Sequence, residues 1–485
     1  MKILNVSSMK TTFFILTFIL FASLTENSVY AQTKEREYWP TSGWKISTPE
    51  MQGMDSAKLL IAEEFIQNRL PDAFSLLVVK NGYLVFEKYY SWGSPEKYAV
   101  VHSVTKSVTS ALIGIALDKG YLNSVDQKLI EFFPEYITDE SDPRKKEISL
   151  KHLLTMSAGF RWNDRGPSMR NWYYSSDWVK FAVQLPQENN PGDIFNYNSS
   201  TSHLLSVILS KSTKTSTLDF AKQNLFEPLG IQSAYWHQDP QGYYIGGFGL
   251  GLSARDLAKF GFLYLNNGYW NGQSIVSESW VKESTGQQIQ TFSHPIYGTF
   301  GYGYHWWVKK VDGCSSFRAW GRRGQFLVVV PELDLVIAVT SGTALSHPPT
   351  SIHYSPLFDL VAASVKRKRP PKKPLKAVEL PTDIKAFITD FNQALFDLDR
   401  IKIADFFSDR FLTNGSTKQM FLNFLWGIIS YVREAKIVLT KLESEGDIAK
   451  IEGIIKDKYF EVPMIANMLI KENGQWKWYG NQIPK

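Results

Sequence analysis

Residues 101–120 read VHSVTKSVTSALIGIALDKG, and they carry both a helix signal and a candidate nucleophile. From Val104 the apolar residues recur at steps of three and four, which is the spacing of one buried helix face. Lys119 and Gly120 then supply a basic last turn and a residue that tolerates the left-handed conformation in which helices often end. The segment therefore predicts a buried helix over residues 104–119, with Ser103 at its first turn.

Ser103 and Lys106 stand three residues apart, so a helix places both side chains on one face. A serine hydroxyl is a poor nucleophile until a neighbouring base takes its proton, and burial among small neutral residues lowers a lysine pKa toward that of a useful base. A lysine also lies three residues after Ser7, Ser94 and Ser279. These serines lie in the N-terminal leader, in a Gly-Ser-Pro turn and in an acidic segment, respectively. We therefore expect the reactive pair at Ser103 and Lys106.

A phenol is the third candidate group, supplied by Tyr197 in the segment FNYNS at residues 195–199. A phenol with a pKa near 10 is a poor base alone, but a cationic Lys106 beside it would stabilise phenolate. Most tyrosines are structural, yet Tyr197 follows a Pro-Gly turn and precedes a predicted helix over residues 201–210. An alcohol, an amine and a phenol can together run acyl transfer without a histidine.

The N-terminus has the features of a secretory signal over residues 1–31. Two lysines precede an apolar run at residues 13–24, and the segment Val29-Tyr30-Ala31 has the small residues of a signal-peptidase cleavage site. The run is shorter than the roughly 18 residues of a membrane helix, so a membrane anchor is the less favoured alternative. We expect cleavage near Ala31 and a periplasmic or secreted protein with no stable membrane span. Cys314 is the only cysteine, so no internal disulfide can form.

A basic, proline-containing stretch at residues 366–376 divides the rest of the chain. It holds seven lysines and arginines, so the formal charge of +6 becomes −1 without it. Its prolines predict a stiff solvated linker, and the lack of interleaved aromatic residues disfavours a nucleic-acid site. We expect a catalytic domain over residues 38–365 and an accessory domain over 377–485. No metal-ligand or phosphate-loop spacing occurs, so we expect no metal and no cofactor.

Strand signals cluster at both ends of the first domain. An Asn-Gly turn separates β-rich runs at residues 73–80 and 83–89, and a second hairpin pattern covers residues 326–330 and 335–340. Predicted helices lie between these hairpins, at residues 58–69, 104–119, 201–210 and 254–266. The order predicts an α+β fold in which helices cover an antiparallel sheet.

Six ordered blocks of residues 38–365 together resemble one family. These blocks are Ser103-x-x-Lys106, LLTMSAGFRW at 153–162, YNS at 197–199, GLGLSARDL at 249–257, YGYHWW at 302–307 and Gly324-Gln325. They resemble the serine β-lactamase-like superfamily, in the branch of class C-type esterases and 6-aminohexanoate-dimer hydrolases. The resemblance implies a helix-sheet-helix domain with an antiparallel central sheet and an active site beside the edge strand.

The resemblance also implies catalytic roles. Ser103 matches the acylated nucleophile, Lys106 the amine that helps to deprotonate it, and Tyr197 the phenol that passes a proton to the leaving group. The family's Lys-Thr-Gly motif is matched by residues 319–321, where Gly321 permits close approach of the backbone. In that alignment the backbone N–H groups of Ser103 and Arg322 would form the oxyanion hole.

Two departures from the family pattern bear on the substrate. Ala319 and Trp320 replace the Lys-Thr pair that binds a carboxylate, and Ser199 stands where related β-lactamases carry asparagine. Both changes disfavour a β-lactamase or a peptidoglycan D-alanyl peptidase, which remain the alternative enzymes. They favour a small-molecule ester or linear amide with an apolar acyl side.

Candidate substrate-binding residues surround the proposed nucleophile. We expect Trp162, Trp306 and Trp320 to line the acyl side, with Ser199 and Gly321 also at the substrate. Arg322 and Arg323 keep open a substrate with a free carboxylate, the alternative being a solvated pair at a strand end. A member of the fold that binds a ligand without catalysis remains a further alternative.

The C-terminal region predicts a smaller α+β domain. Amphipathic helical patterns at residues 384–397, 401–411 and 418–432 precede strand-like runs at 435–442, 448–456 and 465–471. The order resembles nuclear-transport-factor-like or SnoaL-like cones, in pattern more than in motif. No acid–base cluster stands out there, so we expect an accessory role. The sequence does not indicate an oligomeric state.

Overall fold

A computed structural model describes residues 36–232, 234–294, 298–342, 354–368, 378–413, 415–432, 434–464 and 466–482. The expected signal peptide, residues 1–31, lies outside the described residues, as does most of the expected linker. Among the described helices, none combines the length and the apolar character needed to cross a membrane.

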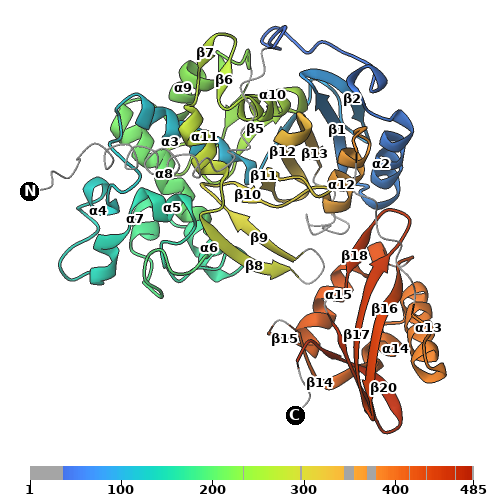
Figure 1. The fold of residues 1–485 in the computed structure, drawn as a ribbon. Coiled ribbons are helices and arrows are strands. Elements are labelled where there is room, and N and C mark those ends of the chain that lie inside the picture. Colours follow the sequence, from blue (N-terminus) through green and yellow to red (C-terminus); the bar gives the residue numbers. More distant parts are fainter. Residues whose placement is uncertain are drawn as a thin grey trace, which may run out of the picture. The chain divides into compact units, whose positions relative to one another are not determined.

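An antiparallel sheet of eight strands organises the first part of the chain (Figure 1). In spatial order the strands are β2 (Tyr83–Tyr89), β1 (Ala73–Lys80), β13 (Leu335–Ser341), β12 (Gln325–Val330), β11 (Phe317–Gly321), β10 (Trp307–Val308), β9 (Gly298–Tyr302) and β8 (Ile289–His294). The first hairpin pairs with the last strand of the region, so chain segments from both ends of the region lie side by side in the sheet. The two predicted hairpins and the antiparallel α+β fold are confirmed.

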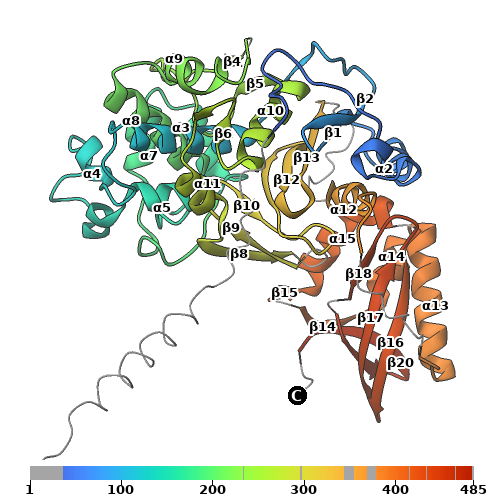
Figure 2. The ribbon, with the colours of Figure 1, turned by 45° about the horizontal axis from the view of Figure 1, so that its top comes forward.

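Both faces of the sheet are covered, because strand side chains alternate between two apolar cores. In β1, Leu77 and Val79 belong to one core, and Leu76 and Val78 belong to the other. Helices α2 (Ser56–Arg69) and α12 (Ser355–Ala363) pack in the second core, whereas α3 (Val104–Asp118) and α10 (Ala254–Leu265) pack in the first (Figures 1 and 2). This is the helix-sheet-helix arrangement that the resemblance implied.

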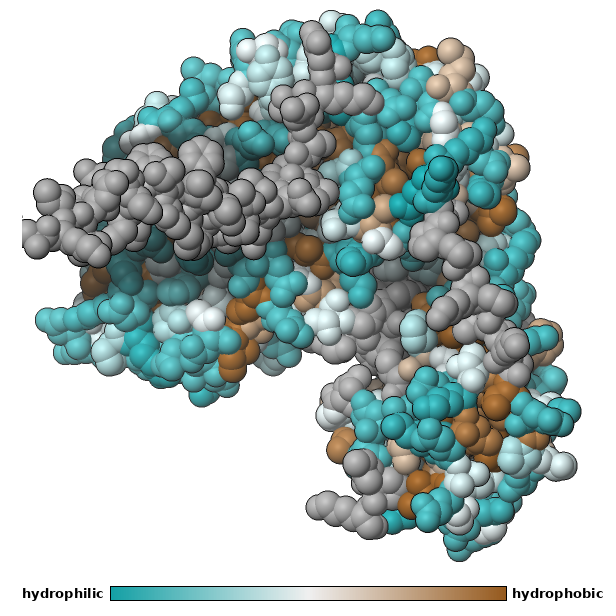
Figure 3. All heavy atoms as spheres, in the orientation of Figure 1, coloured by the Kyte–Doolittle hydropathy of each residue, from teal (hydrophilic) through white to brown (hydrophobic). Residues whose placement is uncertain are grey.

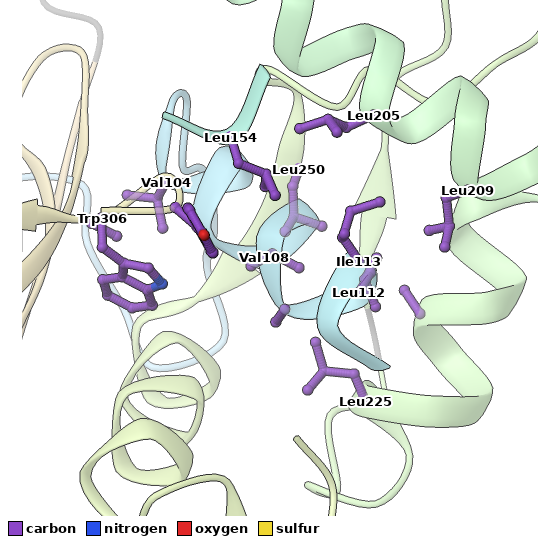
Figure 4. Packing of buried hydrophobic residues seen from close by; sticks show 14 of the residues in the cluster. Val104, Val108, Leu112, Ile113, Leu154, Leu205, Leu209, Leu225, Leu250 and Trp306 are labelled. Carbon is purple, nitrogen blue, oxygen red and sulfur yellow. The ribbon is translucent and has the colours of Figure 1, made fainter. Parts of the chain in front are cut away.

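Helix α3 is the buried centre of a helical region beside the sheet. Its residues from Val104 to Ala116 are all buried, and Gly120 ends it with a left-handed φ of 74°, as the sequence predicted. Figure 4 shows Val108 and Leu112 of α3 among side chains of Leu205, Leu225 and their neighbours. Dense packing on every side gives Ser103, at the N-terminal end of α3, a rigid support.

The first part of the chain also contains shorter helices and strands. They are η1 (Glu50–Gln52), β3 (Tyr98–Val100), α4 (Leu129–Phe132), η2 (Pro143–Glu147), α5 (Leu150–Leu154), α6 (Pro167–Tyr173), α7 (Trp178–Val183), α8 (Ser199–Thr213), α9 (Thr217–Ala221), the π-helix η3 (Lys222–Phe226), β4 (Tyr235–Trp236), β5 (Leu250–Ser253), β6 (Tyr269–Trp270), β7 (Gln273–Ser274), α11 (Glu278–Thr285) and η4 (Pro331–Leu333). Strands β3, β5 and β4 form a separate small sheet, and the carbonyl oxygen of Leu250 in β5 accepts a hydrogen bond of 2.8 Å from the backbone N–H of Val101, two residues before the candidate nucleophile.

The C-terminal region is a second α+β unit with its own apolar core. Its elements are α13 (Thr382–Asp397), α14 (Arg400–Asp405), β14 (Phe407–Thr413), β15 (Ser416–Thr417), α15 (Lys418–Val432), β16 (Lys436–Glu445), β17 (Ile448–Lys456), β18 (Glu461–Pro463), β19 (Met468–Glu472) and β20 (Gln475–Gly480). The sheet order is β15-β14-β20-β19-β17-β16, with β18 beside β17. The resemblance to cone-like folds stays a prediction.

One helix prediction in this region was wrong in its second half. The pattern at residues 401–411 predicted a single helix, but α14 ends at Asp405 and β14 follows. Phe407 and Phe411 are buried in β14, and the parallel pairing of β14 with β20 stabilises the strand. The expected strand at 465–471 also begins later, at Met468.

The loop between β17 and β18 contacts helix α2. Tyr459 packs in the core that contains α2 and α12, with its ring 5.2 Å from that of Phe65. Its hydroxyl accepts a hydrogen bond of 2.9 Å from Asn68 Nδ2. Arg69 lies 3.6 Å from the buried carboxylate of Asp457. Hydrophilic residues cover most of the coloured surface in Figure 3, as expected when apolar side chains are gathered in cores.

Candidate active site

Ser103 lies where a sharp turn enters helix α3. The residue before it, His102, has a left-handed φ of 48°, and Ser103 itself is the N-cap residue with φ −69° and ψ −4°. A non-glycine residue in the left-handed region is uncommon and often marks a functional turn. Ser103 is half-buried, whereas every residue from Val104 to Ala116 is buried, so its hydroxyl lies at the boundary between core and solvent.

Lys106 is buried directly behind this hydroxyl. Its Nζ lies 3.2 Å from Ser103 Oγ, 3.0 Å from Ser199 Oγ and 2.8 Å from the carbonyl oxygen of Gly247. The side chain is only 1% exposed, and this burial lowers the pKa of Lys106 from 10.5 to about 8, against an opposing effect of Asp164. The predicted burial of the lysine and its contact with Ser103 are confirmed.

Sequence reasoning missed the acid that accompanies this lysine. Asp164 Oδ2 accepts a hydrogen bond of 3.1 Å from Ser199 Oγ, while Oδ1 accepts from Ser199 N at 2.9 Å and from Trp162 Nε1 at 3.0 Å. The backbone N–H of Ser199 belongs to the first turn of α8 and has no acceptor within the helix, so a carboxylate is favoured there. Asp164 follows Trp162 by two residues in sequence, but no spacing connects it to Lys106, so only the fold brings them together.

Tyr197 covers the amine from the other side. Lys106 Nζ lies 4.8 Å from the centre of the Tyr197 ring, and the phenol is hydrogen-bonded to the side chain of Ser103. Burial, with Asp164 adding to it, raises the pKa of Tyr197 far above its usual value, and the bond to Ser103 offsets only part of this. The expected stabilisation of a phenolate is therefore not found, and Tyr197 is a neutral phenol in this state.

An aromatic cluster adjoins Tyr197 and differs in one member from the expected set. The ring of Trp307 stacks at 5.8 Å on Tyr197 and lies 5.1 Å from Trp320. Trp306 instead is fully buried against Tyr264, at 4.6 Å, in the core on the α10 side (Figure 4). Adjacent residues in extended chain point to opposite sides, so Trp306 faces the core, contrary to its expected place, and its neighbour Trp307 is the one that stacks on Tyr197.

The side chains of two other expected substrate-binding residues make hydrogen bonds and packing contacts inside the protein. The hydroxyl of Ser199 bonds to both Lys106 and Asp164, and the residue is 2% exposed. Trp162 is buried, packs at 5.9 Å on Trp172 and donates to Asp164. Their contact with a substrate stays a prediction.

Strand β11 approaches the turn before Ser103. A Cβ atom on Gly321 would lie 2.4 Å from the carbonyl oxygen of Val101, so only glycine fits there. Against expectation, β11 is not the edge strand, because β10, β9 and β8 lie beyond it. However, β10 is two residues long and pairs only with Phe317 and Arg318, so it leaves the part of β11 nearest the site without a β10 partner.

Arg322 and Arg323 follow β11 in the turn to β12. Arg322 is exposed and Arg323 is half-buried with a left-handed φ of 66°. Burial, then the charges of Arg323 and Arg322, lower the pKa of His102 to about 4, which places both guanidinium groups within electrostatic range of the residue next to Ser103. The oxyanion-hole role of the Ser103 and Arg322 amides stays a prediction.

Comparisons with known proteins bear on the region just described. A family model described as "Beta-lactamase" matches residues 62–354. A relative described as 6-aminohexanoate-dimer hydrolase, from Paenarthrobacter ureafaciens, is 23% identical over 300 residues, which are 58% of this chain and 74% of the relative. The match includes the segments that carry Ser103, Lys106 and Tyr197.

Two solved structures are similar in fold. A putative 6-aminohexanoate-dimer hydrolase from Bacillus anthracis superposes with a TM-score of 0.52 at 22% identity, over 62% of this chain and 81% of its own. A family VIII carboxylesterase superposes with a TM-score of 0.50 at 16% identity, over 66% of this chain and 98% of its own. At these identities the likeness extends to the fold alone.

Proposed function

Because this chain belongs to the beta-lactamase family, as its motifs predicted, we propose that it is a serine hydrolase that cleaves an ester or a linear amide through an acyl-enzyme. One observation carries the proposal above all others. The amine of Lys106 is almost completely buried, 3.2 Å from Ser103 Oγ, and its pKa is lowered to about 8. A neutral amine at this distance is a suitable base for a serine nucleophile.

The proposed first step transfers the acyl group to Ser103. Lys106 takes the hydroxyl proton as Ser103 Oγ attacks the substrate carbonyl carbon, and the backbone N–H groups of Ser103 and Arg322 stabilise the negative oxygen. The C–O or C–N bond then breaks, and the neutral phenol of Tyr197 protonates the leaving group, with the proton on Lys106 restoring the phenol. Tyr197 suits this donor role because its proton is held in the buried state.

The second step releases the acid. Water attacks the ester carbonyl of acyl-Ser103, gives its proton to the neutral Lys106, and the bond to Ser103 Oγ breaks as that oxygen is protonated again. Lys106 thus accepts a proton and then returns it in each step, as a general acid–base catalyst does in an acyl-enzyme mechanism.

The proposed substrate has an apolar acyl side and lacks a requirement for a β-lactam carboxylate. Trp320 lies where the resemblance places the family's threonine, beside Ala319 at the lysine position, and it packs 6.0 Å from Phe300 and 5.1 Å from Trp307. An indole in an aromatic cluster offers apolar contact area but no charge. We therefore favour short esters and linear amides over penicillins and D-alanyl peptides.

The test is covalent labelling followed by intact mass. Incubation with a fluorophosphonate should add one phosphonyl group to the wild type, and Ser103→Ala should remove both the adduct and p-nitrophenyl ester turnover. Ser279→Ala is a matched control, because Ser279 precedes Lys282 at the same spacing but is exposed. An adduct that persists in Ser103→Ala contradicts the proposal, and nitrocefin turnover at the rate of the best ester contradicts the proposed substrate class.

A further inference from the structure

We infer that Asp164 is a positioning residue for this reaction: by holding the proton of Ser199, it directs the lone pair of the Lys106 amine toward the Ser103 hydroxyl. The inference rests on the proposed function, because it assigns the geometry of the proposed base. It concerns a carboxylate that the family motifs in this sequence do not include.

Asp164 fixes the direction of the Ser199 hydroxyl proton. A carboxylate can only accept hydrogen bonds, and Asp164 Oδ2 lies 3.1 Å from Ser199 Oγ. A hydroxyl has a single proton, so the bond to Asp164 uses it. Ser199 Oγ therefore presents a lone pair, and not its proton, to Lys106 Nζ at 3.0 Å.

The second fixed neighbour of the amine is also an acceptor. The carbonyl oxygen of Gly247 lies 2.8 Å from Lys106 Nζ and cannot donate. A neutral amine has two N–H bonds and one lone pair. Ser199 and Gly247 take the two N–H bonds, which leaves the lone pair for the third neighbour, Ser103 Oγ, at 3.2 Å.

Without the Asp164 acceptor this order is lost. The Ser199 hydroxyl could then rotate and donate its proton to the Lys106 lone pair, which would turn an N–H bond toward Ser103. Water has little access to repair the arrangement, since Lys106 is 1% and Ser199 2% exposed. Asp164 itself is fixed at two further points, by Ser199 N at 2.9 Å and Trp162 Nε1 at 3.0 Å.

The charge of Asp164 adds an effect that can be measured separately. Burial lowers the pKa of Lys106 and the negative charge of Asp164 opposes this, with a net value of about 8. The other titratable groups near the amine are Tyr197, a neutral phenol, and His102 and His305, whose pKa values are held at about 4 and about 3. The charges of Arg323 and Arg322 also act on His102. Removing the charge of Asp164 therefore lowers the pKa of Lys106 further.

The experiment measures the second-order rate constant of fluorophosphonate labelling against pH in the full chain. In the wild type the rate should rise through about pH 8, as Lys106 loses its proton. In Asp164→Asn the midpoint should move to lower pH, while the high-pH plateau falls by roughly 10- to 100-fold because the lone pair is misdirected. A purely structural role would lower the plateau without moving the midpoint.

A second variant keeps the test decisive if Asp164→Asn folds poorly. Ser199→Ala removes the hydroxyl but keeps the negative charge, so its plateau should fall without a downward shift of the midpoint. Combining the two substitutions should lower the plateau no further than the more impaired single variant, because both act through one hydrogen-bond chain. Glu188→Gln is the matched control: it removes a half-exposed charge on a neighbouring loop and should leave the profile unchanged.

The outcomes separate the inference from the proposed function. If labelling persists in Ser103→Ala, the proposed function fails and the inference falls with it. If labelling requires Ser103, but Asp164→Asn and Ser199→Ala keep the wild-type plateau, or their effects on the plateau add, the positioning role alone is overturned. The inference is supported if both variants lower the plateau and the midpoint shifts in Asp164→Asn but not in Ser199→Ala.

Discussion

Lys106 places a titratable amine in an almost solvent-free environment, and this has a cost in stability that depends on pH. The folded protein holds its pKa at about 8, against 10.5 for an unburied lysine. The difference corresponds to about 3 kcal/mol, since one pKa unit is worth about 1.36 kcal/mol. Between pH 8 and 10.5 the unfolded chain binds the proton more tightly, so folding stability rises with pH in that window.

Lys106→Met should remove this pH-dependent penalty. Below pH 8 the penalty is present in full in the wild type, and above pH 10.5 it is absent. The difference in unfolding free energy between the variant and the wild type should therefore change by about 3 kcal/mol in favour of the wild type across this window. Denaturant titrations of both proteins at several pH values measure it. A difference that stays constant with pH would show that the amine titrates normally.

At the same scale, local spacing predicted Ser103 and Lys106 but not their partners. One turn of helix determines how those two side chains relate, so the sequence suffices. Asp164, which acts on the amine through Ser199, and Gly247 lie in loops far from Lys106 in sequence, so no sequence pattern predicts these contacts. The choice between Trp306 and Trp307 also depended on which way an extended segment faces, which the fold decides and a pair of identical residues cannot show.

Among the secondary-structure elements, α3 and β11 together create the site. The hairpins and the long helices followed from turn residues and apolar periodicity, with ends within a few residues of those observed. Short strands such as β10 carry too few residues for a pattern, so the position of β11 inside the sheet was not predictable. The segment at 401–411 fits both a helix and a strand period, and pairing with β20 decides between them.

A single glycine controls the distance between these two elements. In Gly321→Ala the new methyl group would lie 2.4 Å from the Val101 carbonyl oxygen, which is backbone and cannot rotate away. Strand β11 must then move from the turn before Ser103, and we expect ester turnover to fall roughly 100-fold, as an oxyanion-hole donor is misplaced. Steady-state kinetics measure this, with thermal melting as a check on folding.

Gly286→Ala is the matched control for that substitution. It adds the same methyl group at the end of α11, where the nearest carbonyl oxygen is 3.0 Å away, so turnover should stay close to that of the wild type. If Gly321→Ala keeps wild-type turnover, β11 does not contribute to the oxyanion hole in the way we propose.

At the scale of the whole molecule, the contact of the β17–β18 loop with α2 connects two apolar cores that lie in different parts of the sequence. Tyr459 belongs to the core formed by α2, α12 and one face of the large sheet, although its neighbours in sequence belong to the C-terminal sheet. The predicted linker between the two parts suggested independence, and no sequence pattern marked Tyr459 as a core residue of the first part. We expect such long-range packing to couple the unfolding of the two parts.

Tyr459→Ala should therefore uncouple the two parts. Loss of a buried aromatic ring typically costs about 3 kcal/mol, whereas Tyr459→Phe keeps the ring, removes the hydroxyl with its hydrogen bonds to Asn68 and Glu64, and should cost about 1–2 kcal/mol. In calorimetry we expect the alanine variant to separate the melting of the two parts, and the phenylalanine variant to keep the wild-type profile at a slightly lower temperature. Lys458→Ala, which removes an exposed pair with Glu64, is the control and should change neither. Superimposable melting curves for wild type and Tyr459→Ala would show that the two cores unfold independently, and that the contact with α2 transmits no stability between them.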